Sequence, residues 1–369
     1  MEVTIFLFMF FVLPETLMFF GATSITIPVI FSLLLVLLYL FLTKTKLPIA
    51  NWAASASLFA VGLAYILSIS SSSGMFILKS FSEVLFIGAL FLLGRIELSC
   101  NSKRLTNFSI AMLIFILMSP FHALGEGVFN KPVFPFIEPS HFSIFLGYVY
   151  FLSVGYKVHV SKSVSVLCLF IILVLYTNLM ALIVIATIVC HLVYRKHWLL
   201  AVFPAFVLVM FLFTPVASSF LPNELYQRIS LSEENLSSLV YLSGIDNILS
   251  VFREHKLFGN GFASLGYVDF DNEYQSTIMQ LTGSYINLYD GSFIFSKLVY
   301  QFGIFSVFYT LILLMISFEV LNGRAPKGYY WSILMFPVEF FIRSPGLISG
   351  GFVLFYMVCN QWYYEKNSN

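Results

Sequence analysis

Charged side chains are scarce in this sequence. Only 10% of its 369 residues are Asp, Glu, Lys or Arg, and 59% are hydrophobic. A typical soluble domain carries about 25% charged residues. A water-soluble fold of this length could not bury so much Phe, Leu and Ile, so the composition predicts an integral membrane protein. The net charge of +1 comes without a basic tail and gives no reason to expect a nucleic-acid partner.

Cysteine and metal-binding patterns are also scarce. The chain has four cysteines, and none lies in the long polar segment 217–292, so no disulfide framework is expected. No Cys/His cluster has the spacing of a zinc site, and no carboxylate cluster suits another metal, so we expect no metal and no cofactor. The first apolar run lacks a small-residue cleavage site and is interpreted as a span rather than a signal peptide.

Apolar runs of about 20 residues, the length that crosses a bilayer, recur along the chain. The run 164–194 is long for one helix and short for two. Lys157 and Lys162 precede it, and Arg195 and Lys196 follow it. Because cytoplasmic loops collect Lys and Arg, both ends are expected in the cytoplasm, which requires two short helices that turn near residues 176–178. The other predicted spans are 3–20, 25–42, 52–69, 76–93, 107–124, 139–156, 198–216, 293–318, 329–343 and 347–363.

The resulting map predicts an all-α polytopic bundle of about twelve spans, with both termini in the cytoplasm. It forms a single integral membrane domain over residues 1–369. Twelve of the 19 basic residues then lie in cytoplasmic loops. The other seven run against the positive-inside bias, and each needs a reason. They are Lys79, Lys131, Arg228, Arg253, Lys256, Lys297 and Arg343.

One large polar loop, 217–292, is expected outside the cytoplasm. It holds nine of the 18 acidic residues and is rich in Ser, Asn, Gly and Tyr. Apolar residues recur at helical spacing over 237–252, which predicts an amphipathic helix inside the loop.

Ionisable residues stand where outer segments are predicted to enter spans. Glu138 and His141 are three residues apart around Pro139, so they would share one helix face. They either form a polar collar at a helix start or line a functional cavity. Asp290 directly precedes another span and is either a helix cap or an acid, base or hydroxyl contact.

Three arginines are candidates for phosphate binding, because the guanidinium is planar, always charged and matched to phosphate oxygens. Arg228 and Arg253 lie in the large loop, where nearby carboxylates offer them ordinary ion pairs. Arg343 lies at the outer end of a predicted span. Glu339, four residues earlier, is an alternative structural partner for it.

Further polar residues have less specific settings. His255 belongs to a charged patch before Gly259-Asn260-Gly261, which lacks the third glycine of a nucleotide-binding fingerprint. Asn178 in the apolar hairpin either hydrogen-bonds the turn or lines a cavity. Glu83 is expected to form a structural pair with Lys79, four residues earlier.

Taken in order, short motifs make the chain resemble the O-antigen polymerases of the Wzy type. The motifs cover most of the chain from about residue 100 onward, and their order and spacing carry the resemblance more than any one of them. They are 138–142 (EPSHF), 226–228 (YQR), 238–244 (SLVYLSG), 257–262 (LFGNGF), 290–293 (DGSF), 301–304 (QFGI) and 341–346 (FIRSPG).

This resemblance implies a metal-independent glycosyltransferase in a bacterial inner membrane. Its substrates would be oligosaccharide repeat units linked through pyrophosphate to undecaprenol, joined at the periplasmic face. Membrane lipid, a chain-length regulator and a flippase would be its partners. Arg228, Arg253 and Arg343 would bind the pyrophosphate. The catalytic candidates are Glu138, His141 and Asp290, with His255 and Asn178 as further candidates.

Two alternatives remain. The related O-antigen ligases usually carry a His-Asn pair before the span that follows the large loop, where this chain has Asp290-Gly291-Ser292. A flippase or transporter of polysaccharide units would show two similar halves and short outer loops, and neither is visible in the sequence.

Overall fold

The fold is seen in a computed structural model. It describes residues 1–20, 26–42, 81, 83, 84, 86, 88, 90, 93, 96–125, 133–136, 138–176, 178–193, 236–261, 264–266, 272–283, 285, 288, 291–322, 328–344 and 349–368. Within these ranges every regular element is a helix, accompanied only by two isolated β-bridges. The all-α prediction is therefore confirmed for the part of the chain that the structure describes.

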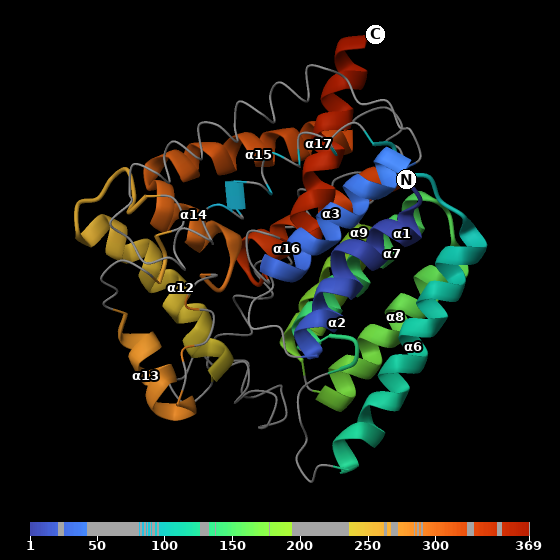
Figure 1. The fold of residues 1–369 in the computed structure, drawn as a ribbon, viewed down its shortest axis with the longest axis horizontal. Coiled ribbons are helices and arrows are strands. Elements are labelled where there is room, and N and C mark those ends of the chain that lie inside the picture. Colours follow the sequence, from blue (N-terminus) through green and yellow to red (C-terminus); the bar gives the residue numbers. More distant parts are fainter. Residues whose placement is uncertain are drawn as a thin grey trace.

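The helices follow one another in the order shown in Figure 1. They are α1 (Val3–Leu7), the π-helical turn η1 (Phe8–Val12), α2 (Leu13–Phe19), α3 (Thr26–Leu42), α6 (Ser102–Gly125), α7 (Pro139–Gly155), α8 (His159–Tyr176), α9 (Leu179–Val193), α12 (Leu236–Arg253), α13 (Glu273–Thr282), α14 (Ile294–Phe302), α15 (Ile304–Asn322), the 3₁₀ helix η3 (Gly328–Met335), α16 (Phe336–Phe341) and α17 (Gly350–Ser368).

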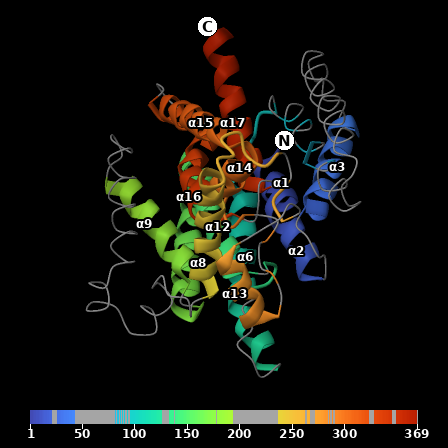
Figure 2. The same cartoon turned by 90° about the vertical axis from the view of Figure 1, so that its left-hand side faces the viewer.

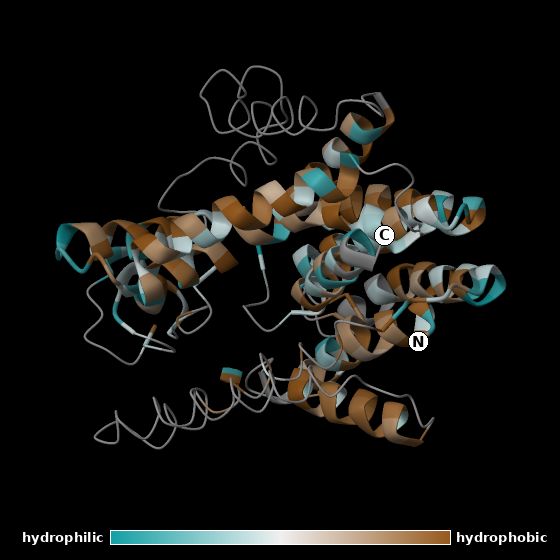
Figure 3. Ribbon diagram, turned by 90° about the horizontal axis from the view of Figure 1, so that it is seen from above, coloured by the Kyte–Doolittle hydropathy of each residue, from teal (hydrophilic) through white to brown (hydrophobic). Residues whose placement is uncertain are grey.

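Two of these helices, α8 and α15, are long and apolar enough to cross a membrane. In each, only 28% of the residues in the most apolar stretch are buried, so most of the apolar surface faces outward. Figure 3 shows long hydrophobic stretches along the helices, with hydrophilic residues mainly towards their ends. Shorter apolar helices cover Val3–Phe19, Pro28–Leu42 and Leu179–Leu192. The predicted spans 52–69 and 198–216 lie outside the described residues, so the count of twelve stays a prediction.

Helix α7 lies at the centre of the bundle. It packs against α8, α9 and η3, and large side chains such as Phe142, Phe145, Tyr148 and Phe151 are buried around its whole circumference. A helix that is apolar on every side is stable only when it is covered on every side. Figure 2 shows α9 and α3 on opposite sides of this bundle, with α12, α13 and α14 in front of it.

Helix boundaries test several expectations. The predicted turn in 164–194 is confirmed, because α8 ends at Tyr176 and α9 begins at Leu179. The side chain of Asn178 accepts a hydrogen bond from the backbone N–H of Ala181 at 3.1 Å, which supports its interpretation as a turn residue. The amphipathic helix predicted over 237–252 is present as α12.

The predicted span 293–318 is wrong as a single helix. It is divided into α14 and α15 at Gly303, whose φ of +57° is a conformation that favours glycine. A Cβ at this position would overlap the carbonyl of Leu257, so the break is built around a close backbone approach.

One end of the bundle is held by polar contacts between early and central segments. Arg104 pairs with Glu2 at 2.5 Å, and the hydroxyl of Tyr156 donates to the carbonyl of Leu98 at 2.5 Å. The charge map places this end in the cytoplasm. A second set of polar contacts lies where the first turn of α2 meets the N-terminal end of α7.

Candidate functional site

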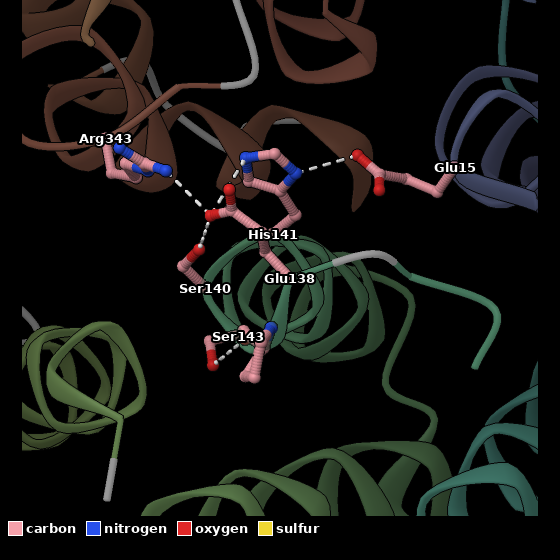
Figure 4. A network of polar contacts seen from close by, with 7 residues as sticks. Glu15, Glu138, Ser140, His141, Ser143 and Arg343 are labelled. Atoms are coloured by element: carbon pink, nitrogen blue, oxygen red, sulfur yellow. Dashed lines mark hydrogen bonds and ion pairs between the residues drawn. The ribbon is translucent and has the colours of Figure 1, made fainter. Parts of the chain in front are cut away.

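Four ionisable side chains from three helical segments converge at the N-terminal end of α7 (Figure 4). Glu138 immediately precedes α7, and His141 lies in its first turn. Glu15 comes from α2, and Arg343 follows the end of α16. The set joins positions separated by more than 120 residues and by more than 200 residues in the chain.

Glu138 is the link between the members of this cluster. Its Oε2 lies 2.7 Å from Nη2 of Arg343 and accepts a hydrogen bond from the hydroxyl of Ser140 at 2.9 Å. The same oxygen is 3.9 Å from Nε2 of His141, which is too far for a hydrogen bond. Burial by itself raises the pKa of the Glu138 carboxyl, but the charge of Arg343, with smaller contributions from His141 and Ser140, holds that pKa well below its usual range. Glu138 is therefore a carboxylate.

His141 is oriented from its other side. Its Nδ1 lies 2.9 Å from Oε1 of Glu15. An ionised carboxylate only accepts hydrogen bonds, so in the neutral imidazole this contact places the ring hydrogen on Nδ1. When the ring is neutral, Nε2 carries the lone pair, and when the ring is charged, Nε2 carries a hydrogen and faces the carboxylate of Glu138.

Accessibility is graded across the cluster. The side chain of Glu138 is 34% exposed, those of His141 and Arg343 are 15% and 16% exposed, and that of Glu15 is 5% exposed. A ligand that approaches this end would therefore meet Glu138, Arg343 and His141 before Glu15. The carboxylate of Glu15 is an inner support for the imidazole.

Local structure fixes the entry to α7. Pro139 occupies the first helical turn, where its fixed φ and missing N–H are tolerated. The rings of Phe136 and Phe142 stack with centroids 4.6 Å apart, which holds the preceding segment against the helix. On the facing element, the π-helical turn η1 stands just before α2, and such turns are frequent at functional sites.

A small cavity lies beneath the cluster. Its lining includes Glu15, His141, Glu339, Ser349 and Gly350, and its volume of about 20 Å³ suffices for one water molecule. The buried carboxyl of Glu339 accepts a hydrogen bond from the hydroxyl of Tyr148 at 2.5 Å. Arg343, for which Glu339 was one alternative partner, contacts Glu138 across a much longer stretch of chain.

Two of the predicted loop candidates, Arg253 and His255, lie away from this cluster. Helices α12 and α14 run parallel, since Ser292 contacts the carbonyl of Val240 before α14 begins and Asn260 contacts that of Tyr300 near its end. Ser292 also accepts a hydrogen bond from the N–H of Ser344, next to Arg343.

Arg253 lies 13 residues beyond Val240, which is roughly 20 Å along α12, and His255 follows it. Arg253 pairs with Asp246 of its own helix. Asp290 and Arg228 lie outside the described residues.

The sequence prediction missed Glu15 and a buried ion pair. Glu15 lies inside the predicted span 3–20, and a carboxylate within an apolar run was a usable signal. Lys297 lies 2.6 Å from Glu83, and both side chains are at most 2% exposed. Lys79, the partner expected for Glu83, lies outside the described residues.

No group of three His, Cys, Asp or Glu side chains in the described part of the chain is arranged to hold a metal ion. The cluster at α7 instead combines one guanidinium, one imidazole and two carboxylates. Such a set can bind an anion and accept a proton from a hydroxyl at neighbouring points. Searches of family models, of curated proteins and of solved structures found no match to this chain, so its chemistry must be argued from its own residues.

Proposed function

We propose that this chain is an O-antigen polymerase of the Wzy type. It joins undecaprenyl-pyrophosphate-linked oligosaccharide units at the periplasmic face of a bacterial inner membrane. The observation that carries the proposal is the convergence of Glu138, His141 and Arg343. Glu138 and Arg343, which come from two of the motifs behind the resemblance, meet at one end of the helical bundle.

The orientation of the bundle supports this assignment. The charge map independently places Glu15, Glu138 and Arg343 at periplasmic ends of spans, and these residues lie together. It places Glu2 and Arg104 at cytoplasmic ends, and these two also lie together. A multi-pass protein with cytoplasmic termini accounts for both groupings.

The proposed role of Arg343 is to stabilise the leaving group of the reaction. In the proposed transfer a hydroxyl of the acceptor sugar attacks the anomeric carbon of the donor glycan. A new C–O bond forms there, the bond to the diphosphate oxygen breaks, and undecaprenyl diphosphate leaves with the electron pair. A fixed guanidinium at the site stabilises the negative charge that develops on that oxygen. Before substrate binds, Glu138 holds Arg343 in place at 2.7 Å, and the more highly charged diphosphate then competes for it.

The proposed role of His141 is to accept the proton of the attacking sugar hydroxyl. Nε2 of His141 is the candidate acceptor for this proton, because the Glu15 contact at 2.9 Å orients the ring and holds the hydrogen on Nδ1. Glu15 acts through His141 and is a positioning residue. The donor is already activated by its diphosphate, so the reaction needs neither a nucleotide nor a metal site.

Deletion of the gene tests the proposed activity. A polymerase deletion should leave lipid A-core that carries a single repeat unit. A ligase deletion should instead leave bare core, with polymer retained on undecaprenol. The measurement is the lipopolysaccharide banding pattern on gels, with the intact strain and a complemented strain as controls. A full polymer ladder in the deletion strain would refute the polymerase assignment.

A further inference from the structure

Large apolar side chains are exposed where α12, the following turn and α15 meet. We call this region the α12–α15 tip, and its members are exposed by 39% to 69%. They are Leu249, Phe252, Leu257, Phe258 and Phe305. The rings of Phe258 and Phe305 stack with centroids 5.5 Å apart, so the turn and the start of α15 form one apolar surface. Figure 1 shows this region at the side of the molecule away from α6 and α8.

The exposure of the tip is fixed by backbone contacts. The N–H of Ile304 donates to the carbonyl of Leu257 at 2.8 Å, and the N–H of Gly261 donates to that of Gln301 at 3.0 Å. Gly259 has φ of +79°, and a Cβ there would clash with the backbone of Gln301. Leu257 and Phe258 are therefore held outward by a turn locked onto the α14–α15 junction.

The tip is continuous with a helix that can span a membrane. On α15, Phe308, Ile312 and Met315 continue the exposed apolar surface beyond Phe305. Exposing these rigidly held apolar side chains to water would cost free energy, whereas contact with lipid acyl chains would not. This continuity identifies lipid as the occupant.

The charges near the tip show which kind of attachment fits. Arg253 pairs with Asp246, and Lys256 pairs with Glu254 at 2.6 Å. Among the described residues, the two cations on this stretch therefore each have a carboxylate partner. Attachment through this surface is apolar and does not depend on anionic headgroups.

We propose that the α12–α15 tip inserts into the bilayer at the boundary between headgroups and acyl chains, beside the N-terminal end of α15. The polar segment 217–292, expected from the sequence to lie wholly outside the membrane, returns to the lipid there. Helices α12 and α14 then lie along the membrane surface and connect the tip to the end of the bundle that carries Arg343. This inference concerns membrane attachment and holds whatever reaction the cluster performs.

Spin labelling of the full-length protein in phosphatidylcholine vesicles tests the insertion. The four native cysteines are replaced by alanine, and one cysteine is introduced by Phe258→Cys or, as a matched control, by Leu281→Cys. Leu281 is a similarly exposed apolar residue of α13 in the same polar loop, at 60%. The collision rates of the label with oxygen, which partitions into lipid, and with a water-soluble nickel chelate are measured at both positions.

The label at position 258 should collide more with oxygen than with the nickel chelate, and the label at 281 should show the reverse. Adding anionic lipid or high salt should leave the result at 258 unchanged. Preferential access of the nickel chelate at 258 would overturn the proposal. So would exclusion of both reagents, which would show that protein covers the tip. Phe258→Trp gives a second measurement, and it is a milder change because the four native cysteines are kept. The fluorescence added by this tryptophan should be quenched by lipids brominated near the headgroup.

Discussion

Arg343 is the residue on which the proposed leaving-group chemistry depends most. Arg343→Ala should abolish ladder formation while membrane abundance stays near normal. Arg343→Lys should restore only part of the activity, because an ammonium keeps the charge but loses the planar fork. Modal chain length and membrane protein level are measured together in one strain background. Lys366→Ala is the matched control, since it removes a cation whose partner, Glu319, lies in α15 rather than in the cluster.

Glu138→Gln separates this role from a purely structural one. If Arg343 only neutralises Glu138, loss of either charge should lower protein abundance to a similar degree. If Arg343 binds the diphosphate, Glu138→Gln should retain more activity than Arg343→Ala, because the charged guanidinium is still present. A fully active Arg343→Ala variant would remove this arginine from the site.

Glu15 offers a second test at the residue scale. Glu15→Gln preserves the size of the side chain but places an amide next to Nδ1 of His141. Because an amide can donate as well as accept a hydrogen bond, it no longer fixes the ring hydrogen on Nδ1. The polymerisation rate per molecule should fall by about 10²-fold, the usual scale of a general-base contribution. Glu15→Asp should recover part of that loss, and Glu2→Gln, which alters the opposite end, should be neutral. The rate is measured with purified protein and lipid-linked repeat units. Equal activity of Glu15→Gln and the unaltered chain would contradict the role.

The sequence predicted the members of the cluster unequally, for a physical reason. Glu138 and His141 share one helix turn, so their proximity follows from local geometry alone. The position of Arg343 beside them depends on how α16 packs against α7, and the sequence predicted only that all three lie at outer ends of spans. Glu15 and the Lys297–Glu83 pair are contacts between distant helices. No spacing rule within one helix predicts such contacts.

Among the helices, the approach of α7 to η3 makes the sharpest demand on residue size. A Cβ on Gly155 would overlap the backbone carbonyl of Gly328. Gly155→Ala should therefore push η3 away from α7 and lower the free energy of unfolding by about 1–3 kcal/mol, the usual cost of overpacking. Thermal unfolding in detergent measures the change. Gly283→Asn is the control, because its φ of +71° suits Asn and nothing lies within 4 Å of a Cβ there. A Gly155→Ala protein as stable as the control would contradict this packing.

Element boundaries were predictable where charge or periodicity encoded them. Basic residues on both sides of 164–194 predicted an even number of helices, and the break falls between Tyr176 and Leu179. Apolar spacing alone predicted α12. The break at Gly303 was missed because residues 293–318 are apolar almost throughout, and the reason for the break is a contact with Leu257 in another segment. The 3₁₀ geometry of η3 likewise cannot be predicted from a hydropathy pattern.

Two independent lines bear on the predicted orientation of the whole molecule. Positive charge predicts which loops stay in the cytoplasm. Packing groups Glu2 with Arg104 at one end of the bundle and Glu15 with His141 at the other. Both lines agree on α1, α2, α6 and α7. Only the charge pattern orients the spans between 43 and 80 and between 194 and 235, so the map as a whole needs a direct test.

Reporter fusions provide that test. Fusions at Lys103, Lys162, Lys196 and Lys327 should report a cytoplasmic location, and fusions near Lys131 and Asn260 a periplasmic one. The pair at Lys162 and Lys196 is decisive, because α8 and α9 lie between them and return the chain to the same side only if both cross the bilayer. If these two fusions report opposite sides, the α8–α9 hairpin does not span twice. The large loop would then face the cytoplasm, away from any substrate displayed in the periplasm, and the polymerase assignment would fail with it.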